Sequence, residues 1–353
     1  SPKQLGEVLF EKLKIHETLN FTGKLARTTL GYKTDAEVLE KFSEHPIVAL
    51  IQEYRELSKL LSTYILVLPS LVKKSTGRLH THFNQIGTAT GRLSSSEPNL
   101  QNIPIRTSWG KKVRAAFSAS KPQHIILSAD YSQIELRVLA HLSQDPNLVS
   151  AFHAQVDIHR KTAAEILGKA LSEVTDEERG RAKAINFGIM YGMGAQRLSK
   201  EQKISFNEAK TFIEKYFLNF FHVKEYLDSQ RHSAHKTGQA STFFGRIRPL
   251  PEIQSSDQNM ARLAENMAIN SPVQGTAADI MKFGMIQVHR ALRNENLQTK
   301  IVLQVHDELV LDGPLEELDS VTKLVRHAME HAVEFLIPLT VDVKHGKNWL
   351  EAK

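Results

Sequence analysis

The order of apolar and polar residues predicts that the first 75 residues are mostly helical. Residues 4–15 (QLGEVLFEKLKI) repeat leucine and valine at the spacing of one helix face, and residues 36–42 and 45–68 continue that pattern. Between them, residues 21–34 (FTGKLARTTLGYKT) are polar, basic and glycine-containing, which indicates a mobile loop or a tip.

Four later segments have the pattern of β-strands. Residues 77–95 alternate polar and apolar side chains, and residues 124–130 (HIILSAD) form a short apolar run that ends in a carboxylate. Residues 301–311 (IVLQVHDELVL) place two acids between two runs of β-formers, and residues 339–349 indicate a last strand. Because these strands are short and suit hairpins, we expect an α+β fold and not a doubly wound sheet.

The rest of the second half is helical in pattern. Helical spacing runs through residues 153–235, 259–292 and 314–336, and it is interrupted near Ser271-Pro272. Residues 238–253 (GQASTFFGRIRPLPEI) indicate a loop or a hairpin.

Composition and charge limit the class of protein. A chain of 353 residues predicts two or three subdomains. It has no cysteine, which excludes disulfides, thiol catalysis and cysteine-ligated zinc, and no run of 18 apolar residues that could span a membrane. The net charge of +6 favours an anionic partner such as nucleic acid, although many other proteins share it. The sequence contains neither a phosphate-binding loop nor a dinucleotide fingerprint.

Two acidic sites suggest metal chemistry. Burying an unpaired carboxylate is costly, so Asp307 and Glu308 either mark a tight turn or hold a cation. Asp130 ends another apolar strand, where it could cap the next helix or supply a further carboxylate. Carboxylates from two distant segments would suit a two-metal phosphoryl-transfer site, because Mg²⁺ takes few protein ligands and uses substrate phosphates for the rest.

A second group of residues suits a nucleotide. Arg179, Lys183, Phe187 and Tyr191 recur every four residues, along one helix face. Two cations suit a polyphosphate and two rings suit a base or sugar, although a solvated cationic face beside core aromatics has the same spacing. Further residues could reach phosphates and base edges, or form ordinary surface pairs and caps: Arg92, Arg246, Arg248, Asn270 and Gln274.

Taken together and in this order, three segments resemble the signature motifs of family A DNA polymerases of the bacterial type. They are DYSQIELR at 130–137, the R-x-x-x-K-x-x-x-F-x-x-x-Y-G helix at 179–192, and QVHDE at 304–308. The resemblance covers essentially the whole chain and implies the right-hand fold of the polymerase region. The implied parts are a thumb at 1–75, helical fingers at 137–262, and a palm at 76–136 and 263–353 that carries an antiparallel sheet.

The resemblance implies that deoxynucleoside triphosphates are added to the 3′-hydroxyl of a primer on template DNA, with release of pyrophosphate. It implies two Mg²⁺ ions, replaceable by Mn²⁺, which are held by Asp130, Asp307 and the backbone carbonyl of Tyr131, with Glu308 as an auxiliary acid.

Other roles follow from the same resemblance. Arg179, Lys183 and His159 would bind the phosphates of the nucleotide. Phe187 would lie beside the sugar and base, and Tyr191 would position the template base. Glu135, with Gln133 beside it, would block a 2′-hydroxyl on the sugar. Lys183 would also protonate pyrophosphate. On the DNA side they fall to Arg92, Gln274, Asn270, Arg246, Arg248 and His306.

Two positions depart from the family pattern. Asn266 stands where bacterial relatives usually have arginine, and Ile247 interrupts a basic run after Gly245; both would weaken the grip on DNA. The sequence begins at Ser1, inside the expected thumb, so we expect neither proofreading nor 5′-nuclease activity from this chain. We further expect a monomer in the bacterial cytoplasm, at the nucleoid.

Three other functions stay open. A single-subunit RNA polymerase would share the chemistry, but Glu135 and Phe187 argue against it. A DNA-binding remnant without activity would not need Asp130, Asp307 and Lys183. A nuclease with the same metal pair would have no use for the cation-aromatic helix.

Overall fold

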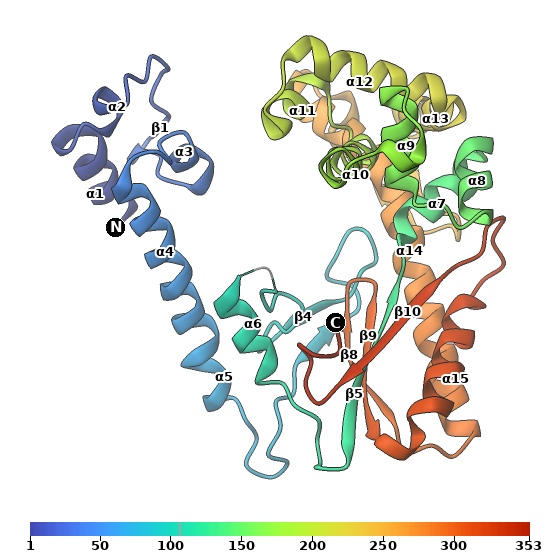
Figure 1. Cartoon of the computed structure of the whole chain (residues 1–353). Helices are drawn as coiled ribbons and strands as arrows, with labels where there is room; N and C mark the ends of the chain where they lie inside the picture. The colour runs from blue at the N-terminus through green and yellow to red at the C-terminus, as the bar shows by residue number, and fades with distance from the viewer. Residues whose placement is uncertain (106) are drawn as a thin grey trace. The chain divides into compact units, whose positions relative to one another are not determined.

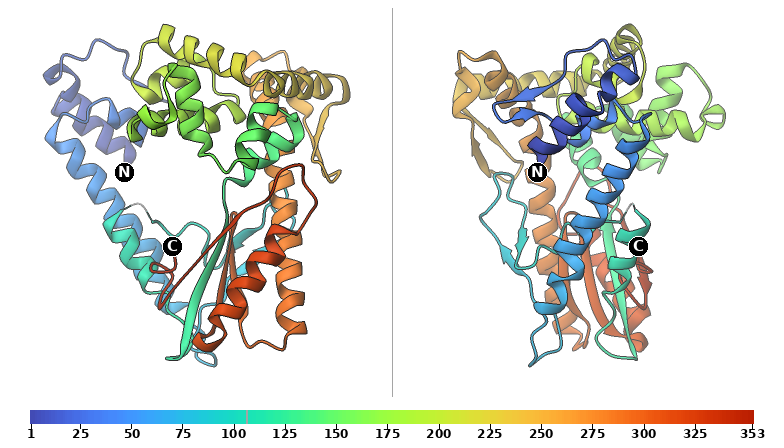
Figure 2. Two further views of the ribbon diagram at one scale, coloured as in Figure 1. Left: turned by 45° about the vertical axis from the view of Figure 1, so that its right-hand side comes forward. Right: turned by 90° about the vertical axis from the view of Figure 1, so that its left-hand side faces the viewer.

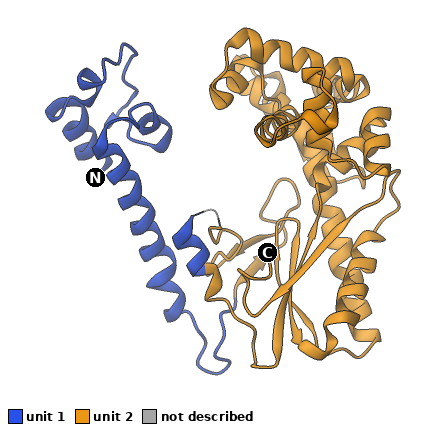
Figure 3. Cartoon of the chain, in the orientation of Figure 1, with its two compact units in different colours: residues 1–80, 106–113 blue, residues 81–105, 114–353 orange. Residues whose placement is uncertain are grey.

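The computed structural model describes residues 1–105 and 107–353, which form two compact units (Figure 3). The first unit holds Ser1–His80 and a short segment that ends at Val113. The second unit holds Thr81–Ile105 and Arg114–Lys353. Helices predominate and the strands pair antiparallel, so the expected α+β fold is confirmed.

The first unit is helical with one small hairpin. Its elements are α1 (Pro2–Glu7), the π-helix η1 (Val8–Lys12), α2 (Ile15–Thr18), β1 (Arg27–Thr28), β2 (Gly31–Tyr32), α3 (Ala36–Glu40), α4 (Pro46–Leu60), the π-helix η2 (Leu61–Ile65) and α5 (Val67–Ser70). The loop expected at 21–34 thus contains the β1–β2 hairpin. Phe10 and Phe21 pack edge-on against Phe42 in a small core of its own. Helix α6 (Ser108–Ala115) continues from this unit into the second.

The second unit combines a sheet with many helices (Figure 1). Its helices are α7 (Ile134–Ser143), α8 (Pro146–His153), α9 (Ile158–Leu167), α10 (Asp176–Met190), α11 (Ala195–Gln202), α12 (Phe206–Asn219), α13 (Phe221–Thr237), α14 (Gln258–Asn294) and α15 (Leu318–Glu330). Short 3₁₀ turns lie at η3 (Leu171–Glu173), η4 (Pro251–Gln254) and η5 (Leu315–Glu317). Its strands are β3 (His82–Asn84), β4 (Ser94–Ser96), β5 (His124–Tyr131), β6 (Gln239–Ser241), β7 (Ile247–Pro249), β8 (Lys300–Val305), β9 (Glu308–Pro314) and β10 (Val341–Gly346).

Four of these strands form the main sheet, in the order β10-β5-β9-β8, and all neighbours are antiparallel. Asp130 on β5 lies opposite Asp342 on β10 and Glu308 on β9. Paired positions of neighbouring strands place their side chains on the same face, so these three acids form one row across the sheet. The intervening residues Ala129 and Tyr131 face the other side.

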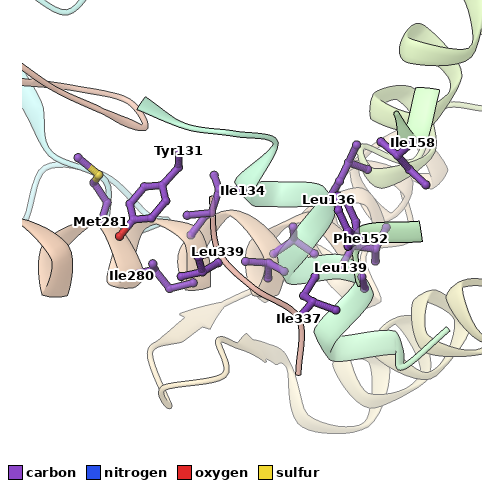
Figure 4. Packing of buried hydrophobic residues seen from close by; sticks show 14 of the residues in the cluster. Tyr131, Ile134, Leu136, Leu139, Phe152, Ile158, Ile280, Met281, Ile337 and Leu339 are labelled. Carbon is purple, nitrogen blue, oxygen red and sulfur yellow. The ribbon is translucent and has the colours of Figure 1, made fainter. Parts of the chain in front are cut away.

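That other side packs against α14 and α15. The Tyr131 hydroxyl donates to the Met329 carbonyl oxygen at 2.7 Å, and a Cβ at Gly284 would stand 2.7 Å from that hydroxyl. Apolar side chains from β5, α7, α8, α9 and α14 form one continuous core, with Tyr131 near Met281 at one end and Ile158 at the other (Figure 4). Two further views show α14 running from the helical part of this unit along the sheet (Figure 2). The core therefore holds the sheet and the helices above it as one body.

Two expectations about helices are wrong in detail. Helix α14 passes through Ser271-Pro272 without interruption. Proline removes a backbone donor, but here both residues are buried, and the Ser271 hydroxyl donates to the Met267 carbonyl at 2.6 Å. Tertiary packing compensates for the lost bond. The helix expected at 314–336 is confined to α15, since the chain beyond it turns back toward β10 and the Leu336 N–H donates to His141 Nδ1 at 3.1 Å.

Among the described residues, no helix is both long enough and apolar enough to cross a membrane.

Candidate active site

The acids at 307 and 308 lie at the tip of the β8–β9 hairpin. Val305 pairs with Glu308, so His306 and Asp307 form a two-residue turn. His306 adopts a φ of 54°, the left-handed conformation that such a tight turn requires. The Tyr131 N–H donates to the Asp307 carbonyl oxygen at 3.0 Å and ties this tip to the end of β5. The sheet therefore brings Asp130 and Asp307 together from segments that are far apart in the sequence.

The electrostatics of the two aspartates favour a bound cation. Burial raises the pKa of Asp307 to about 6; Arg92 opposes this shift, while Glu135 and Asp130 add to it. Burial also raises the pKa of Asp130, with Lys353 acting in the opposite direction. Both shifts mean that the ionised carboxylates are destabilised where they stand. A divalent cation between them would relieve that cost.

Glu308 is buried and fully engaged. Its Oε1 accepts hydrogen bonds from Ser128 Oγ at 2.7 Å and from Trp349 Nε1 at 3.0 Å, and Lys353 Nζ lies 2.6 Å from Oε2. Burial alone would raise its pKa, but Lys353 and these hydrogen bonds hold the pKa of Glu308 below its usual value. In this structure neither oxygen of Glu308 is left free of a protein partner.

A polar network connects the hairpin tip with the end of α10. Arg92 Nη2 donates to Glu135 Oε1 at 2.8 Å and lies 3.7 Å from Asp307 Oδ1. The Tyr191 hydroxyl donates to Glu135 Oε2 at 2.8 Å, and Gln274 Nε2 donates to the Tyr191 hydroxyl at 3.2 Å. Burial, with Glu135 next in importance, raises the pKa of Tyr191 to about 12, so it acts as a neutral donor. Glu135 itself is buried, and this network fixes it.

Gln133 occupies the junction between β5 and α7. Its φ of 53° is left-handed and lets the chain turn sharply from the strand into the helix. The turn sets Glu135 on the first turn of α7, two residues later.

The cation-aromatic face lies on α10, next to the start of α9. Arg179 Nε donates to Asp157 Oδ2 at 2.6 Å, whereas the Lys183 side chain is exposed. His159 is 2% exposed, its ring lies 5.8 Å from that of Phe187, and its Nδ1 is within 3.0 Å of Asn186 Nδ2. Burial lowers the pKa of His159 to about 4, so the imidazole is neutral at pH 7.

The arginines expected to contact DNA are held by protein groups in this structure. Arg246 donates through Nη2 and Nε to Asp279 Oδ1, at 2.6 and 3.1 Å. Arg248 Nη1 donates to Ser271 Oγ at 3.1 Å. These contacts orient the β6–β7 hairpin against α14. Asn270 is half-buried on α14, one turn before Gln274.

The chemistry of Asp130 and Asp307 fits a divalent cation. Asp130 and Asp307 supply oxygen donors whose ionised forms lack sufficient stabilisation, and a divalent cation held by them would take its remaining ligands from water or a bound molecule. Within 1–105 and 107–353, no cluster of three or more His, Cys, Asp or Glu side chains is arranged to hold a metal. Protein alone thus supplies only part of a coordination sphere.

Several residues of this site carry no signal in the sequence. Lys353 reaches Glu308 from the end of the chain, and Asp279 pairs with Arg246 from the middle of a long helix. Asp157 could have been found from the sequence, because aspartate is a preferred helix N-cap and it precedes the helix that carries His159. Asn266 packs against Gly192, where an added Cβ would meet its Oδ1 at 2.0 Å.

Comparison with known proteins defines the class of this chain. The chain belongs to DNA polymerase family A, whose family model matches residues 1–351. It is 50% identical over its whole length to DNA polymerase I of Caldicellulosiruptor bescii, and 47% identical to the thermostable DNA polymerase I of Thermus aquaticus. It covers 41% and 42% of those relatives, so the chain spans about two fifths of their length.

A solved structure has the same fold. It is the POL domain of Pol1 from M. smegmatis in complex with a DNA primer-template and dNTP, and it matches with a TM-score of 0.92 at 42% identity. The match covers 100% of this chain and 61% of that one.

Proposed function

We propose that this chain is the polymerase region of a DNA-directed DNA polymerase. It adds deoxynucleoside triphosphates to the 3′-hydroxyl of a primer on template DNA and releases pyrophosphate. The observation that carries this proposal is the meeting, in one compact unit, of the Asp130–Asp307 pair with the α10 face, through the network of Arg92, Glu135 and Tyr191. Membership of the family and the DNA and dNTP in the similar structure support it.

Asp130, Asp307 and the backbone carbonyl of Tyr131 would hold two divalent ions, with Mg²⁺ as the expected metal and Mn²⁺ as a substitute. When bound, the ions would lower the pKa of the primer hydroxyl and neutralise the triphosphate. Arg92, within 3.7 Å of Asp307, helps to keep that carboxylate ionised and in place. The rigid hairpin tip positions the acid before any substrate arrives.

The α10 face would receive the incoming nucleotide. Arg179, Lys183 and His159 would bind the phosphates, and Lys183, whose side chain is exposed, would give a proton to the leaving pyrophosphate. The neutral imidazole of His159 acts as a hydrogen-bond donor and not as a charge. Phe187 lies beside the sugar and base, and Tyr191 at the end of the helix contacts the template base.

Glu135 would exclude ribonucleotides. It is buried and held at both carboxylate oxygens by Arg92 and Tyr191, so it cannot move aside for a 2′-hydroxyl. Gln133, on the turn that precedes it, faces the same nucleotide. Phe187 in place of tyrosine predicts poor acceptance of dideoxynucleotides.

The remaining site residues would bind primer-template DNA. Arg92 and Gln274 read the minor groove at the primer end, His306 supports the primer terminus, and the DNA strands are contacted by Asn270, Arg246 and Arg248. Binding of DNA would require the two arginines to exchange or share their present partners, Asp279 and Ser271.

The parts of the chain would act as thumb (1–75), palm (76–136 and 263–353) and fingers (137–262). We further propose a monomer that works in the bacterial cytoplasm at the nucleoid. This proposal assigns nucleotide addition to the chain and no proofreading.

Primer extension tests the function. A labelled primer on template DNA, with Mg²⁺ and four deoxynucleotides, should be lengthened by the protein, whereas Asp130→Ala should lower the rate by about a thousandfold or more. Asp319→Ala, which removes an exposed acid from α15, is the matched control and should extend normally.

Other outcomes would contradict the proposal. Shortening of the primer would indicate a nuclease, and equal use of ribonucleotides would indicate an RNA polymerase. Primer-template binding with no extension would indicate a DNA-binding protein without activity.

A further inference from the structure

The segment that follows β10, residues 347–353, folds back on itself in a fixed conformation. A Cβ at Gly346 would meet Glu351 Cβ at 2.3 Å, so this close approach requires glycine. Asn348 Oδ1 accepts hydrogen bonds from the N–H groups of Leu350 and Glu351 at 3.1 and 3.0 Å. The Lys347 N–H donates to Glu351 Oε2 at 2.9 Å. The segment is therefore built as a compact turn and is not a loose end.

Trp349 anchors this segment to the body of the second unit. Its indole is 1% exposed, its ring meets that of Phe117 edge-on, and the Arg114 guanidinium stands 3.9 Å from the ring centroid. The Trp349 N–H donates to the Phe117 carbonyl at 2.9 Å. At its other side the indole Nε1–H donates to Glu308. Trp349 therefore holds this segment next to the row formed by Asp130, Glu308 and Asp342, which we call the carboxylate row.

The last residue of the sequence, Lys353, meets that row. Its Nζ lies 2.6 Å from Glu308 Oε2 and 3.5 Å from Asp130 Oδ2. Glu308, Asp130 and Asp342 occupy adjacent positions on three neighbouring strands, where like charges repel. The chain end lies next to these strands in the ribbon drawing as well (Figure 1). The positive charge of Lys353 therefore offsets the repulsion between the negative charges of the row.

We propose that Lys353 is a built-in counter-ion of the carboxylate row, and that it sets how tightly the site binds divalent cations. The inference rests on the proposed function, because it takes Asp130 and Asp307 as the metal ligands. Lys353 binds Glu308, and Glu308 is held by Ser128 and Trp349 as well. The ammonium is thereby fixed beside Asp130, where it repels an arriving divalent ion.

This arrangement gives Lys353 a positioning role. While metal is absent, the ammonium offsets the repulsion between neighbouring carboxylates and keeps Asp130 in place. When metal binds, the ammonium competes with it. Metal affinity is then lower than two aspartates alone would give, and the metal is held firmly only once nucleotide phosphates complete its coordination.

Binding of Mn²⁺ to the protein without DNA and nucleotide tests the inference. Electron paramagnetic resonance reports free Mn²⁺ during a titration. Lys353→Met should tighten Mn²⁺ binding by about three- to tenfold at 0.1 M salt, because it removes a fixed positive charge near the site. Lys353→Arg keeps the charge and should bind Mn²⁺ as the unsubstituted protein does.

Lys347→Met is the matched control. It makes the same substitution in the same segment at an exposed side chain, and should leave Mn²⁺ affinity unchanged within about twofold. Circular dichroism and the thermal midpoint establish that each variant is folded. Unchanged or weakened Mn²⁺ binding in folded Lys353→Met would overturn the inference.

Asp307→Asn separates the two proposals. If Asp307→Asn abolishes Mn²⁺ binding while Lys353→Met has no effect, the proposed metal site stands and the counter-ion role is wrong. If Asp307→Asn leaves Mn²⁺ binding intact, the metal site is elsewhere and both proposals fail.

Discussion

The carboxylate row and Lys183 on α10 differ in how their charges are balanced. In the row, Glu308 is bound by Ser128, Trp349 and Lys353. Beside the row, in the hairpin turn, Asp307 Oδ1 lies 3.7 Å from Arg92 Nη2. On α10, within the part of the chain that the structure describes, Lys183 has no ion-pair or hydrogen-bond partner.

The difference reflects the two surroundings. The buried carboxylate of Glu308 must be neutralised for the fold to be stable, so the protein supplies Lys353 there. An exposed lysine at a helix surface costs little without a partner, so it can wait for a ligand. The ion pairs of the row thus fix the positions of its carboxylates, whereas the Lys183 ammonium is available to bind a ligand.

After the loss of Asp130, removal of the unpaired cation on α10 should have the largest effect. Lys183→Ala should lower the catalytic efficiency for deoxynucleotides by about a hundredfold or more, because it removes a charged contact with the phosphates. Stability should change little, since the side chain is exposed. Single-turnover incorporation at increasing nucleotide concentration measures the effect.

Arg181→Ala supplies the control for this comparison. Arg181 lies on the same helix, and its Nη2 donates to exposed Glu177 at 2.7 Å. Its loss should alter incorporation less than about threefold, as expected of an exposed pair. Equal losses in both variants would mean that the α10 face acts by general charge and not through Lys183.

Glu135 tests the paired part of the site. Glu135→Ala should raise the use of ribonucleotides relative to deoxynucleotides by about tenfold to a hundredfold, because it opens space at the sugar. It should also destabilise the fold by about 2–4 kcal/mol, since Arg92 and Tyr191 both lose their acceptor. Competition between the two nucleotide types and chemical unfolding measure these effects.

Glu135→Gln distinguishes bulk from charge. It keeps the volume of the side chain, so sugar selection should persist although the charge that pairs with Arg92 is gone. Loss of selection in the glutamine variant would show that the charge, and not the size, excludes ribonucleotides.

The smallest effect concerns pH. The pKa of His159 lies at about 4 in the folded protein, chiefly through burial, and at about 6.5 in an unfolded chain. Between these values the unfolded chain binds more protons, so stability falls as the pH falls from about 6.5 toward 4. His159→Gln should reduce the loss of unfolding free energy between pH 7 and pH 5 by about 2 kcal/mol.

His232→Gln, at an exposed position of α13, is the control and should leave the pH dependence of unfolding as it is. An identical pH dependence in His159→Gln and the unsubstituted protein would mean that His159 takes up a proton as readily in the folded state as in the unfolded one.

The local sequence pattern was sufficient to predict the strand and the helix that carry the site residues. The apolar run before Asp130 predicted β5, and the period of four in 179–191 predicted a helix, which is α10. Pattern failed at Pro272, because the buried setting that keeps α14 continuous involves residues outside the local window. It failed also at the end of α15, where the Leu336 N–H is bound by His141, 195 residues away.

By itself, the sequence determined that two acid-tipped strands and one cation-aromatic helix exist, because these depend on periods of two and four residues along the chain. Only the tertiary structure decided which charges face one another. Glu308 is hydrogen-bonded to Ser128, 180 residues away in the sequence, and to Lys353, 45 residues away. Arg92 is hydrogen-bonded to Glu135, 43 residues away. Such pairs depend on burial, because a carboxylate removed from water needs a hydrogen-bond donor, and tertiary packing decides which donor lies close enough.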